Sequence, residues 1–133
     1  MSEAELQANL AVYLRMQHPA AIFHSDFGSG VKLSMYQAKM QKIQNGGKRA
    51  WPDMFIAEPK WDMNGNRDYH GLFIELKKEG TRLKKKNGEW ASPHIQEQAE
   101  LLEQLAARGY VATFAVGFIE AVNIIDDYLG GKR

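Results

Sequence analysis

The sequence predicts an α/β fold in which a central mixed β-sheet is flanked by helices. Three observations lead to this prediction: amphipathic helical segments near both ends, two β-rich runs joined by a turn, and a helix between the second run and a later strand. A short turn favours an antiparallel pair of strands, whereas a helical crossover favours a parallel pair. A sheet that contains both kinds of pair, with helices on its faces, follows from these patterns.

The composition is that of an ordinary globular protein. Of 133 residues, 44% are hydrophobic and 25% are charged, which predicts one domain over residues 1–133. The absence of cysteine excludes disulfides and thiolate metal sites. We find no signal-peptide pattern and no apolar run of membrane-spanning length, so we expect an intracellular protein that does not enter the membrane. Because the net charge is only +1, nucleic-acid affinity would have to come from local clusters of cations.

Four helices and two outer strands are expected around the central turn. Apolar residues recur at helical spacing in each helical segment, and a serine stands at the start of the first three as an N-cap. The third helix is the crossover that should make the strand after it parallel to the strand before it. The expected helices span residues 3–17, 34–44, 92–108 and 118–129, and the expected outer strands span residues 20–24 and 110–116.

The rest of the chain is organised around a hairpin over residues 51–78. An Asn-Gly pair at residues 64–65 lies between its two β-rich runs, which is a strong hairpin signal. We interpret the polar insert around this pair as a loop. A turn centred on the pair places Asp53 opposite the neighbourhood of Glu75 to Lys77, to within a residue or two.

Alternation along the second strand of the hairpin separates apolar from charged side chains. Leu72, Ile74 and Leu76 share one face, which suits a core, whereas Glu75 and Lys77 share the other. Charges in the middle of an apolar strand are costly unless they are paired or bind a ligand. The strand therefore has one face for packing and one face for chemistry.

Asp53 and Glu75 form a candidate metal site at one end of the hairpin. Two carboxylates supply hard oxygen ligands for Mg²⁺ or Mn²⁺, and the backbone carbonyl of Leu76 is a candidate third ligand. Lys77 beside the metal can orient or help to deprotonate a water and can neutralise a phosphate oxygen. The alternative is an ordinary Glu–Lys ion pair on a solvated face. A Pro-Asp pair at hairpin spacing favours the metal site.

Cationic segments leave both ends of the hairpin. A basic loop precedes it, and a longer basic run follows the proposed catalytic lysine. Cations beside a metal site are suited to hold a phosphodiester backbone, although a solvated loop is the alternative for each segment. The candidate DNA-binding residues are Lys48, Arg49, Lys78, Arg82, Lys84, Lys85 and Lys86.

An ordered set of short motifs covers nearly the whole chain. Its members are Glu3-Ala4-Glu5-Leu6-Gln7, Pro52-Asp53, Glu75-Leu76-Lys77, Gln98, Leu101, Leu105 and Gly109-Tyr110. This set resembles the VRR-NUC branch of the PD-(D/E)XK nuclease superfamily, in particular its stand-alone phage and prophage members. The resemblance implies a restriction-endonuclease-like core and a metal-dependent DNA endonuclease that hydrolyses a phosphodiester bond in one step.

The resemblance also assigns two residues outside the hairpin. A glutamate of the first helix joins the metal cluster in the family. Glu3 matches it best by its offset in the motif, and Glu5 is the alternative. A family glutamine lies near the scissile phosphate, where it would position the phosphate or the attacking water. Gln98 matches that glutamine, with Gln96 and His94 as nearby alternatives.

Stand-alone members of the family resemble Holliday-junction resolvases, which act as dimers. We therefore expect a homodimer that cuts branched DNA in the cytoplasm of a bacterial or phage-infected cell. One alternative is a repair or restriction-type nuclease on flapped or linear duplex DNA. Another is a DNA-binding accessory protein with an inactive nuclease core. The intact set of Asp53, Glu75 and Lys77 argues against the second alternative.

Overall fold

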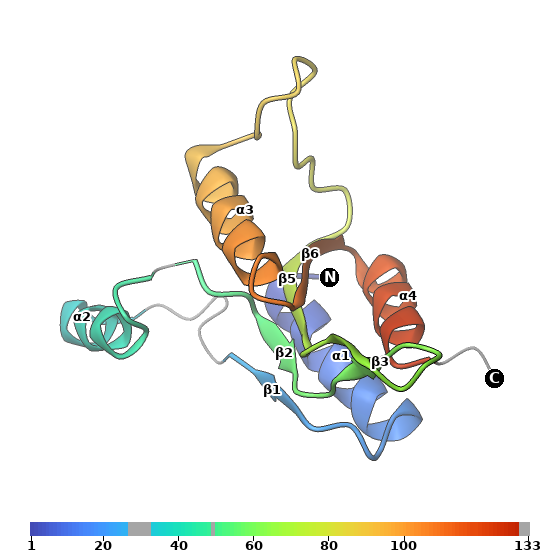
Figure 1. Ribbon diagram of the computed structural model, residues 1–133. Helices are drawn as coiled ribbons and strands as arrows, with labels where there is room; N and C mark the ends of the chain where they lie inside the picture. The colour runs from blue at the N-terminus through green and yellow to red at the C-terminus, as the bar shows by residue number, and fades with distance from the viewer. Residues whose placement is uncertain (27–32, 49, 131–133) are drawn as a thin grey trace.

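The computed structural model describes residues 1–26, 33–48 and 50–130. Four strands, β2 to β5, follow one another in the middle of the chain, and helices separate the other strands (Figure 1). Within the described ranges, no helix combines the length and hydropathy needed to cross a membrane. The elements are α1 (Glu3–Gln17), β1 (Phe23–Ser25), α2 (Met35–Gln44), β2 (Met54–Ile56), β3 (Lys60–Trp61), β4 (Arg67–Tyr69), β5 (Leu72–Lys77), α3 (Pro93–Ala106), β6 (Val111–Val116) and α4 (Phe118–Tyr128).

The central sheet is mixed and has the strand order β1-β2-β5-β6. The pairs β1–β2 and β2–β5 are antiparallel, whereas β5 and β6 are parallel and are joined through α3. The predicted parallel pairing is therefore confirmed. In the antiparallel pair, Met54 lies opposite Ile74 and Phe55 opposite Phe73, which is within one residue of the register expected from the sequence.

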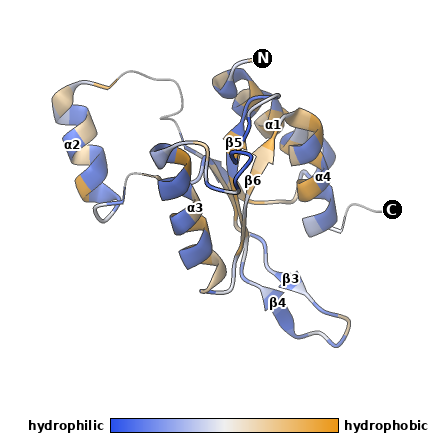
Figure 2. Ribbon diagram, turned by 90° about the horizontal axis from the view of Figure 1, so that it is seen from above, coloured by the Kyte–Doolittle hydropathy of each residue, from blue (hydrophilic) through white to orange (hydrophobic). Residues whose placement is uncertain are grey.

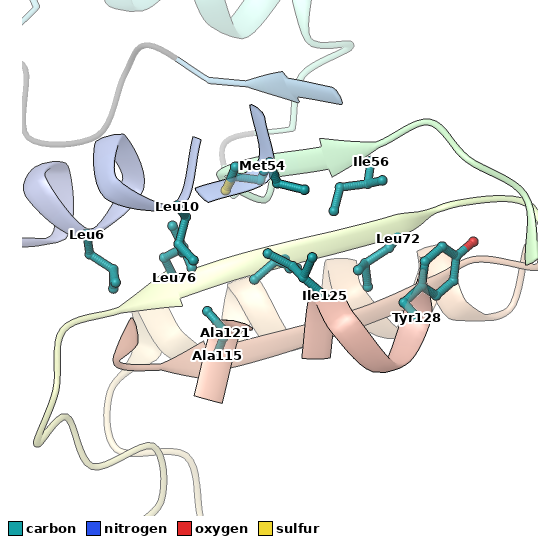
Figure 3. Close-up of a cluster of buried hydrophobic side chains, with 12 residues drawn as sticks. Leu6, Leu10, Met54, Ile56, Leu72, Leu76, Ala115, Ala121, Ile125 and Tyr128 are labelled. Atoms are coloured by element: carbon teal, nitrogen blue, oxygen red, sulfur yellow. The ribbon is translucent and has the colours of Figure 1, made fainter. Parts of the chain in front are cut away.

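Helices cover the two faces of this sheet unequally. In the view from above, the sheet lies between α3 on one side and α1 and α4 on the other (Figure 2). The main core fills the α1–α4 side, where Leu72, Ile74 and Leu76 of β5 are buried as predicted (Figure 3). The opposite side chains of β5, including Glu75 and Lys77, consequently lie on the α3 side of the sheet.

The polar insert of the hairpin differs from the predicted loop, because it contains a small sheet of its own. Strands β3 and β4 pair antiparallel and project away from the central sheet (Figure 2). Asp62 organises their turn, since its side chain accepts hydrogen bonds from the backbone N–H groups of Asn64 and Asn66. Gly65 has φ +81°, a conformation that glycine adopts without strain.

Strand β1 is shorter than predicted and lies further along the chain. The expected strand began at Ala20, but the chain turns after α1, and the Ala21 N–H donates to the carbonyl oxygen of His18 at 3.0 Å. This local bond withholds the Ala21 N–H from the sheet, and the first bond to β2 is the one that the Ile22 carbonyl oxygen accepts from the Ala57 N–H at 2.8 Å. The sequence pattern of apolar residues did not reveal the turn.

Helix α2 stands apart from the sheet in both views (Figures 1 and 2). None of its residues is buried. Met35 is almost fully exposed, and Tyr36 is largely exposed. The indole N–H of Trp51 donates to the carbonyl oxygen of Asn45, the C-cap of α2, at 3.2 Å. Trp51 therefore links the end of α2 to the segment that enters β2.

Candidate active site

Asp53 and Glu75 meet at the edge where β2 begins and β5 ends. The register of the two strands, extended by one residue, places them opposite each other. The carboxylate of Asp53 accepts a hydrogen bond from the Leu76 backbone N–H at 2.8 Å. One residue further, Pro52 lies opposite Leu76 and has no N–H to donate. The residue opposite therefore donates no hydrogen bond to the Leu76 carbonyl oxygen. This oxygen is thus suited to be a metal ligand.

The environment of the carboxylate pair disfavours two negative charges. Only 4% of Glu75 is exposed, and its Oε1 atom has no hydrogen-bond partner in the described part of the chain. Burial, followed by the negative charge of Asp53, raises the pKa of Glu75 to about 10. Burial also raises the pKa of Asp53. Buried acids with an unsatisfied oxygen are unfavourable alone and become favourable beside a cation.

The donor set fits a hard divalent ion. Asp53, Glu75 and the Leu76 carbonyl offer oxygen atoms only, as Mg²⁺ and Mn²⁺ prefer. The orphaned Oε1 atom of Glu75 is the observation that supports this fit, because a bound cation would give it the partner it lacks. The described residues contain no cluster of three acidic, histidine or cysteine side chains arranged to hold an ion. Glu3 therefore does not complete a cluster of three carboxylates with Asp53 and Glu75 in the described structure.

The raised pKa of Glu75 predicts how the metal-free protein responds to pH. Between pH 4.5 and about 10, folded Glu75 keeps a proton that the unfolded chain has released. The folded state therefore binds more protons, and its stability should fall as pH rises through this window. Glu75→Gln should flatten that decline. Urea unfolding in the presence of a chelator measures it, with the exposed Glu103→Gln as control, which should decline as the parent does. A variant Glu75→Gln with the parent's pH dependence would contradict the assignment.

Glu3 and Glu5 of α1 differ in their surroundings. Glu3 is half-buried and lines the same cleft as the carboxylate pair, and its charge helps to raise the pKa values of Asp53 and Glu75. Glu5 is exposed and accepts a hydrogen bond from the Ser2 N–H at 3.0 Å as part of a capping box. The structure thus brings Glu3 near the site and commits Glu5 to the helix start.

The two candidate glutamines of α3 also separate. Gln98 is buried and lines the cleft, and its Oε1 atom has no hydrogen-bond partner among the described residues. Gln96 is exposed and its amide donates to Glu100 at 3.3 Å. His94 is exposed at the cleft wall, close to the start of α3. Of the three side chains, Gln98 is the one that combines burial in the cleft with an acceptor oxygen that lacks a partner among the described residues.

The main cleft lies between α2, the N-terminal half of α3 and the carboxylate pair. Its volume is about 840 Å³. Lys77, only 6% exposed, lies on the floor strand β5, so a positive charge accompanies the two carboxylates. The charged residues lining the cleft are Glu3, Asp26, Lys39, Lys42, Lys48, Asp53, Glu75 and Lys77. Acids and cations are therefore combined in one cleft.

The predicted DNA-binding cations fall into two groups. Lys48 lines the cleft, and Arg49 lies outside the described residues. The other five, from Lys78 to Lys86, are exposed on a hairpin-like arm that projects between β5 and α3 (Figure 1). In this arm the Lys84 ammonium lies 4.7 Å from the centre of the Trp90 ring. None of these five is among the described residues that line the cleft.

Sequence reasoning missed three residues at the site. Lys39 and Lys42 of α2 line the cleft, and their spacing of one helical turn was the available signal. Gln7 appeared only as a member of the first motif and was given no role of its own. Its side chain is buried, and its amide donates to the carbonyl oxygens of Asp26 at 2.6 Å and Asp53 at 3.3 Å. A glutamine within the buried stripe of α1 was the signal for this link.

A mixed four-stranded sheet with helices on both faces and paired acids at adjoining strand ends defines a restriction-endonuclease-like fold. The chain is similar to a solved structure described as a VRR_NUC domain protein, with a TM-score of 0.63 and 26% sequence identity. The similarity covers 98% of this chain and 89% of that one. This similarity agrees with the resemblance of the ordered motifs to the VRR-NUC family. No protein-family model and no curated protein matches the sequence.

Proposed function

We propose that this chain is a metal-dependent DNA endonuclease whose catalytic centre is the carboxylate pair Asp53 and Glu75. The observation that carries the proposal is the buried Glu75 oxygen without a partner, adjoining Asp53 and a buried lysine. A protein that used these residues only for folding would gain more from an apolar cluster. The free-energy cost of burying these charged side chains is explained if they hold a metal ion and its substrate.

Each of these residues of the cleft would have its own role in the reaction. Asp53, Glu75 and the Leu76 carbonyl would hold Mg²⁺ or Mn²⁺, and Glu3 would add negative charge beside them. Bound there, the ion would act as a Lewis acid toward the phosphodiester and lower the pKa of water. The Lys77 ammonium would neutralise a non-bridging phosphate oxygen or orient the attacking water. The Gln98 carbonyl oxygen would accept a hydrogen bond from that water and so fix its direction.

Helix α2 supplies a cationic wall opposite this centre. Lys39 and Lys42 line the cleft from α2, and Lys48 follows the helix. Phosphate contacts of this kind hold a DNA strand in register without reading its sequence. The basic arm after β5 would hold the DNA further from the cut.

Replacing Lys39 and Lys42 together by glutamine should weaken DNA binding and make it less dependent on salt. Each lost phosphate contact should reduce the slope of log K against log salt by about one. Fluorescence anisotropy at several salt concentrations, with metal omitted, measures this slope. A double variant Arg15→Gln and Arg67→Gln removes the same charge from exposed positions that do not line the cleft. Equal slopes for the two double variants would exclude α2 from the DNA path.

The family resemblance directs the choice of substrate. Stand-alone members resemble junction resolvases, so we propose a preference for branched DNA and action as a homodimer, which presents two centres to a four-way junction. Labelled linear, flapped and four-way substrates, each with Mg²⁺, Mn²⁺ or a chelator, test the proposal. Metal-dependent cutting that is fastest on a branched substrate is expected.

The other outcomes of this assay are informative. Equal cutting of linear duplex would replace branch selectivity by a restriction-type activity. An absence of cutting with either ion on every substrate would contradict the endonuclease proposal and favour a binding role. Sedimentation with and without a four-way substrate tests the assembly, and a monomer under both conditions would contradict the homodimer.

A further inference from the structure

A row of aromatic side chains adjoins the carboxylate pair on the same face of the sheet. The strand registers align His24 of β1 with Phe55 of β2, and Phe55 with Phe73 of β5. Asp53 and Glu75 lie two positions along β2 and β5, and therefore on the same face. Two residues along a strand span about 6.6 Å, so the aromatic row directly follows the carboxylate row.

Helices leave this aromatic row partly uncovered. Helix α3 packs over β6, and α2 stands apart from the sheet on the same side as α3 (Figure 2). Phe55 and Phe73 are only partly buried, and His24 is exposed. The rings of Phe55 and Phe73 stack with their centroids 4.4 Å apart. The Trp51 ring lies 6.1 Å from that of Phe73, centroid to centroid, at a tilt of 51°. Three aromatic rings thus gather beside the candidate active site.

A hollow of about 180 Å³ lies at this row. Trp51, Phe55 and Phe73 contribute its apolar lining, and His24, Asp26 and Asn45 contribute polar groups. The hollow adjoins the main cleft, because Asp26, Asn45, Trp51 and Asp53 line both. Trp51 is held in place by its hydrogen bond to the Asn45 carbonyl oxygen. A chain that enters the cleft therefore has direct access to the hollow.

We propose that this hollow binds one unpaired nucleobase of the strand whose phosphate lies at Asp53 and Glu75. The inference rests on the proposed nuclease function and specifies its substrate. Aromatic rings stack on the flat face of any base, and the polar lining can satisfy the base edge. A paired and stacked base has both its faces and its pairing edge covered, so it cannot enter. The nuclease would then require an unpaired nucleotide at a fixed position beside the cut.

An apolar surface on a second copy of the chain is the other occupant to consider. The lining shared with the acid-lined cleft and the polar residues of the hollow favour a base, since both suit a nucleotide whose phosphate lies at the carboxylates. A pocket for a second copy would have no reason to open onto the candidate active site. The experiments below separate the two occupants.

The first test changes the substrate and leaves the protein intact. Single abasic nucleotides are placed in turn at each position around the cut in the most rapidly cleaved branched substrate. We expect cleavage to fall about tenfold when one particular position next to the cut lacks its base, because one stacking contact is lost. Equal cleavage of all the abasic substrates and the parent would overturn the proposal.

The second test follows the base directly by 2-aminopurine fluorescence, which stacking quenches, with metal omitted so that the DNA stays uncut. The probe is placed in turn at each unpaired position of a branched substrate. Wild type should quench it at one position, which should coincide with the position that the abasic series identifies. The double variant Phe55→Leu and Phe73→Leu keeps apolar side chains but removes the flat rings, and should lose the quenching. Trp61→Leu, which removes an exposed aromatic ring outside the hollow, should retain it. Urea unfolding of each variant checks that the fold is intact.

The outcomes distinguish failure of this inference from failure of the proposed function. If wild type cleaves DNA but neither the abasic series nor the probe selects a position, the base pocket is wrong and the nuclease stands. If wild type quenches the probe but never cleaves with Mg²⁺ or Mn²⁺, the pocket stands and the nuclease fails. If the phenylalanine double variant changes only the sedimentation of the protein, the hollow is an interface between copies and the proposal is overturned.

Discussion

Glu75→Gln is expected to reduce the rate of DNA cleavage by three orders of magnitude or more, roughly the effect of losing a ligand of a catalytic metal. Glutamine preserves the shape of this buried side chain but removes the charge that an ion requires. The variant should fold as well as the parent, because Glu75 has an unpaired oxygen and gains little from its surroundings. Single-turnover cleavage with Mn²⁺ measures the effect.

Two companions control this experiment. Asp53→Asn should cause a loss of similar size, since Asp53 adjoins Glu75 and its negative charge helps to raise the pKa of Glu75. Glu103→Gln removes an exposed carboxylate of α3 and should cleave at the parent rate. If Glu75→Gln and Asp53→Asn both cleave as fast as the parent, the catalytic assignment of the hairpin is wrong.

Lys77→Met should reduce cleavage by about 10²–10³-fold, the usual cost of removing one group that stabilises transition-state charge. Methionine fills much of the buried space of the lysine chain but carries no ammonium. Because Lys77 is a cation and no ligand, Mn²⁺ binding should be retained or become tighter. Single-turnover cleavage and metal titration of the same sample provide both values.

Arg67→Met is a matched control for that substitution. It removes a cation from the projecting β3–β4 hairpin, and the residue does not line the cleft. We expect parent activity from it. A variant Lys77→Met that cleaves normally would show that the buried ammonium serves only to balance charge in the fold. A loss of cleavage together with a loss of metal binding would indicate a rearranged site.

The sequence predicted the hairpin of the candidate active site well, because a turn signal and an apolar alternation both constrain it. The Asn-Gly turn determines the register that places Asp53 opposite Glu75, and the alternation of β5 determines which side chains face the core. A one-residue error in the register would have exposed Leu72 and Ile74, so the apolar pattern leaves little freedom. The parallel pairing of β6 followed from the helical crossover in the same way.

Other features depend on contacts that no local pattern records. The position of α2 is one of them. The helix was expected from its capping serine and spacing, but its place opposite the carboxylates depends on the chain around it and on the Trp51 link to Asn45. The roles of Lys39 and Lys42 were missed for that reason. The small β3–β4 sheet escaped notice because strands of two or three residues leave almost no periodic signal.

The buried polar side chains show a similar limit. The sequence indicated that Glu75 was an unusual charge in an apolar strand, but the raised pKa depends on burial by neighbouring elements and on Asp53. Gln7 is a clearer case, because its amide joins β1 to the start of β2 through backbone carbonyl groups. Such links become visible only when the segments are placed side by side.

A calorimetric titration of Mn²⁺ into the protein without DNA tests the proposed metal site most directly. Wild type should bind the ion, and Asp53→Asn and Glu75→Gln should each weaken this binding strongly, whereas Glu103→Gln should leave it unchanged. Binding that is equally tight in wild type and in both site variants would contradict the claim that this carboxylate pair holds the catalytic metal.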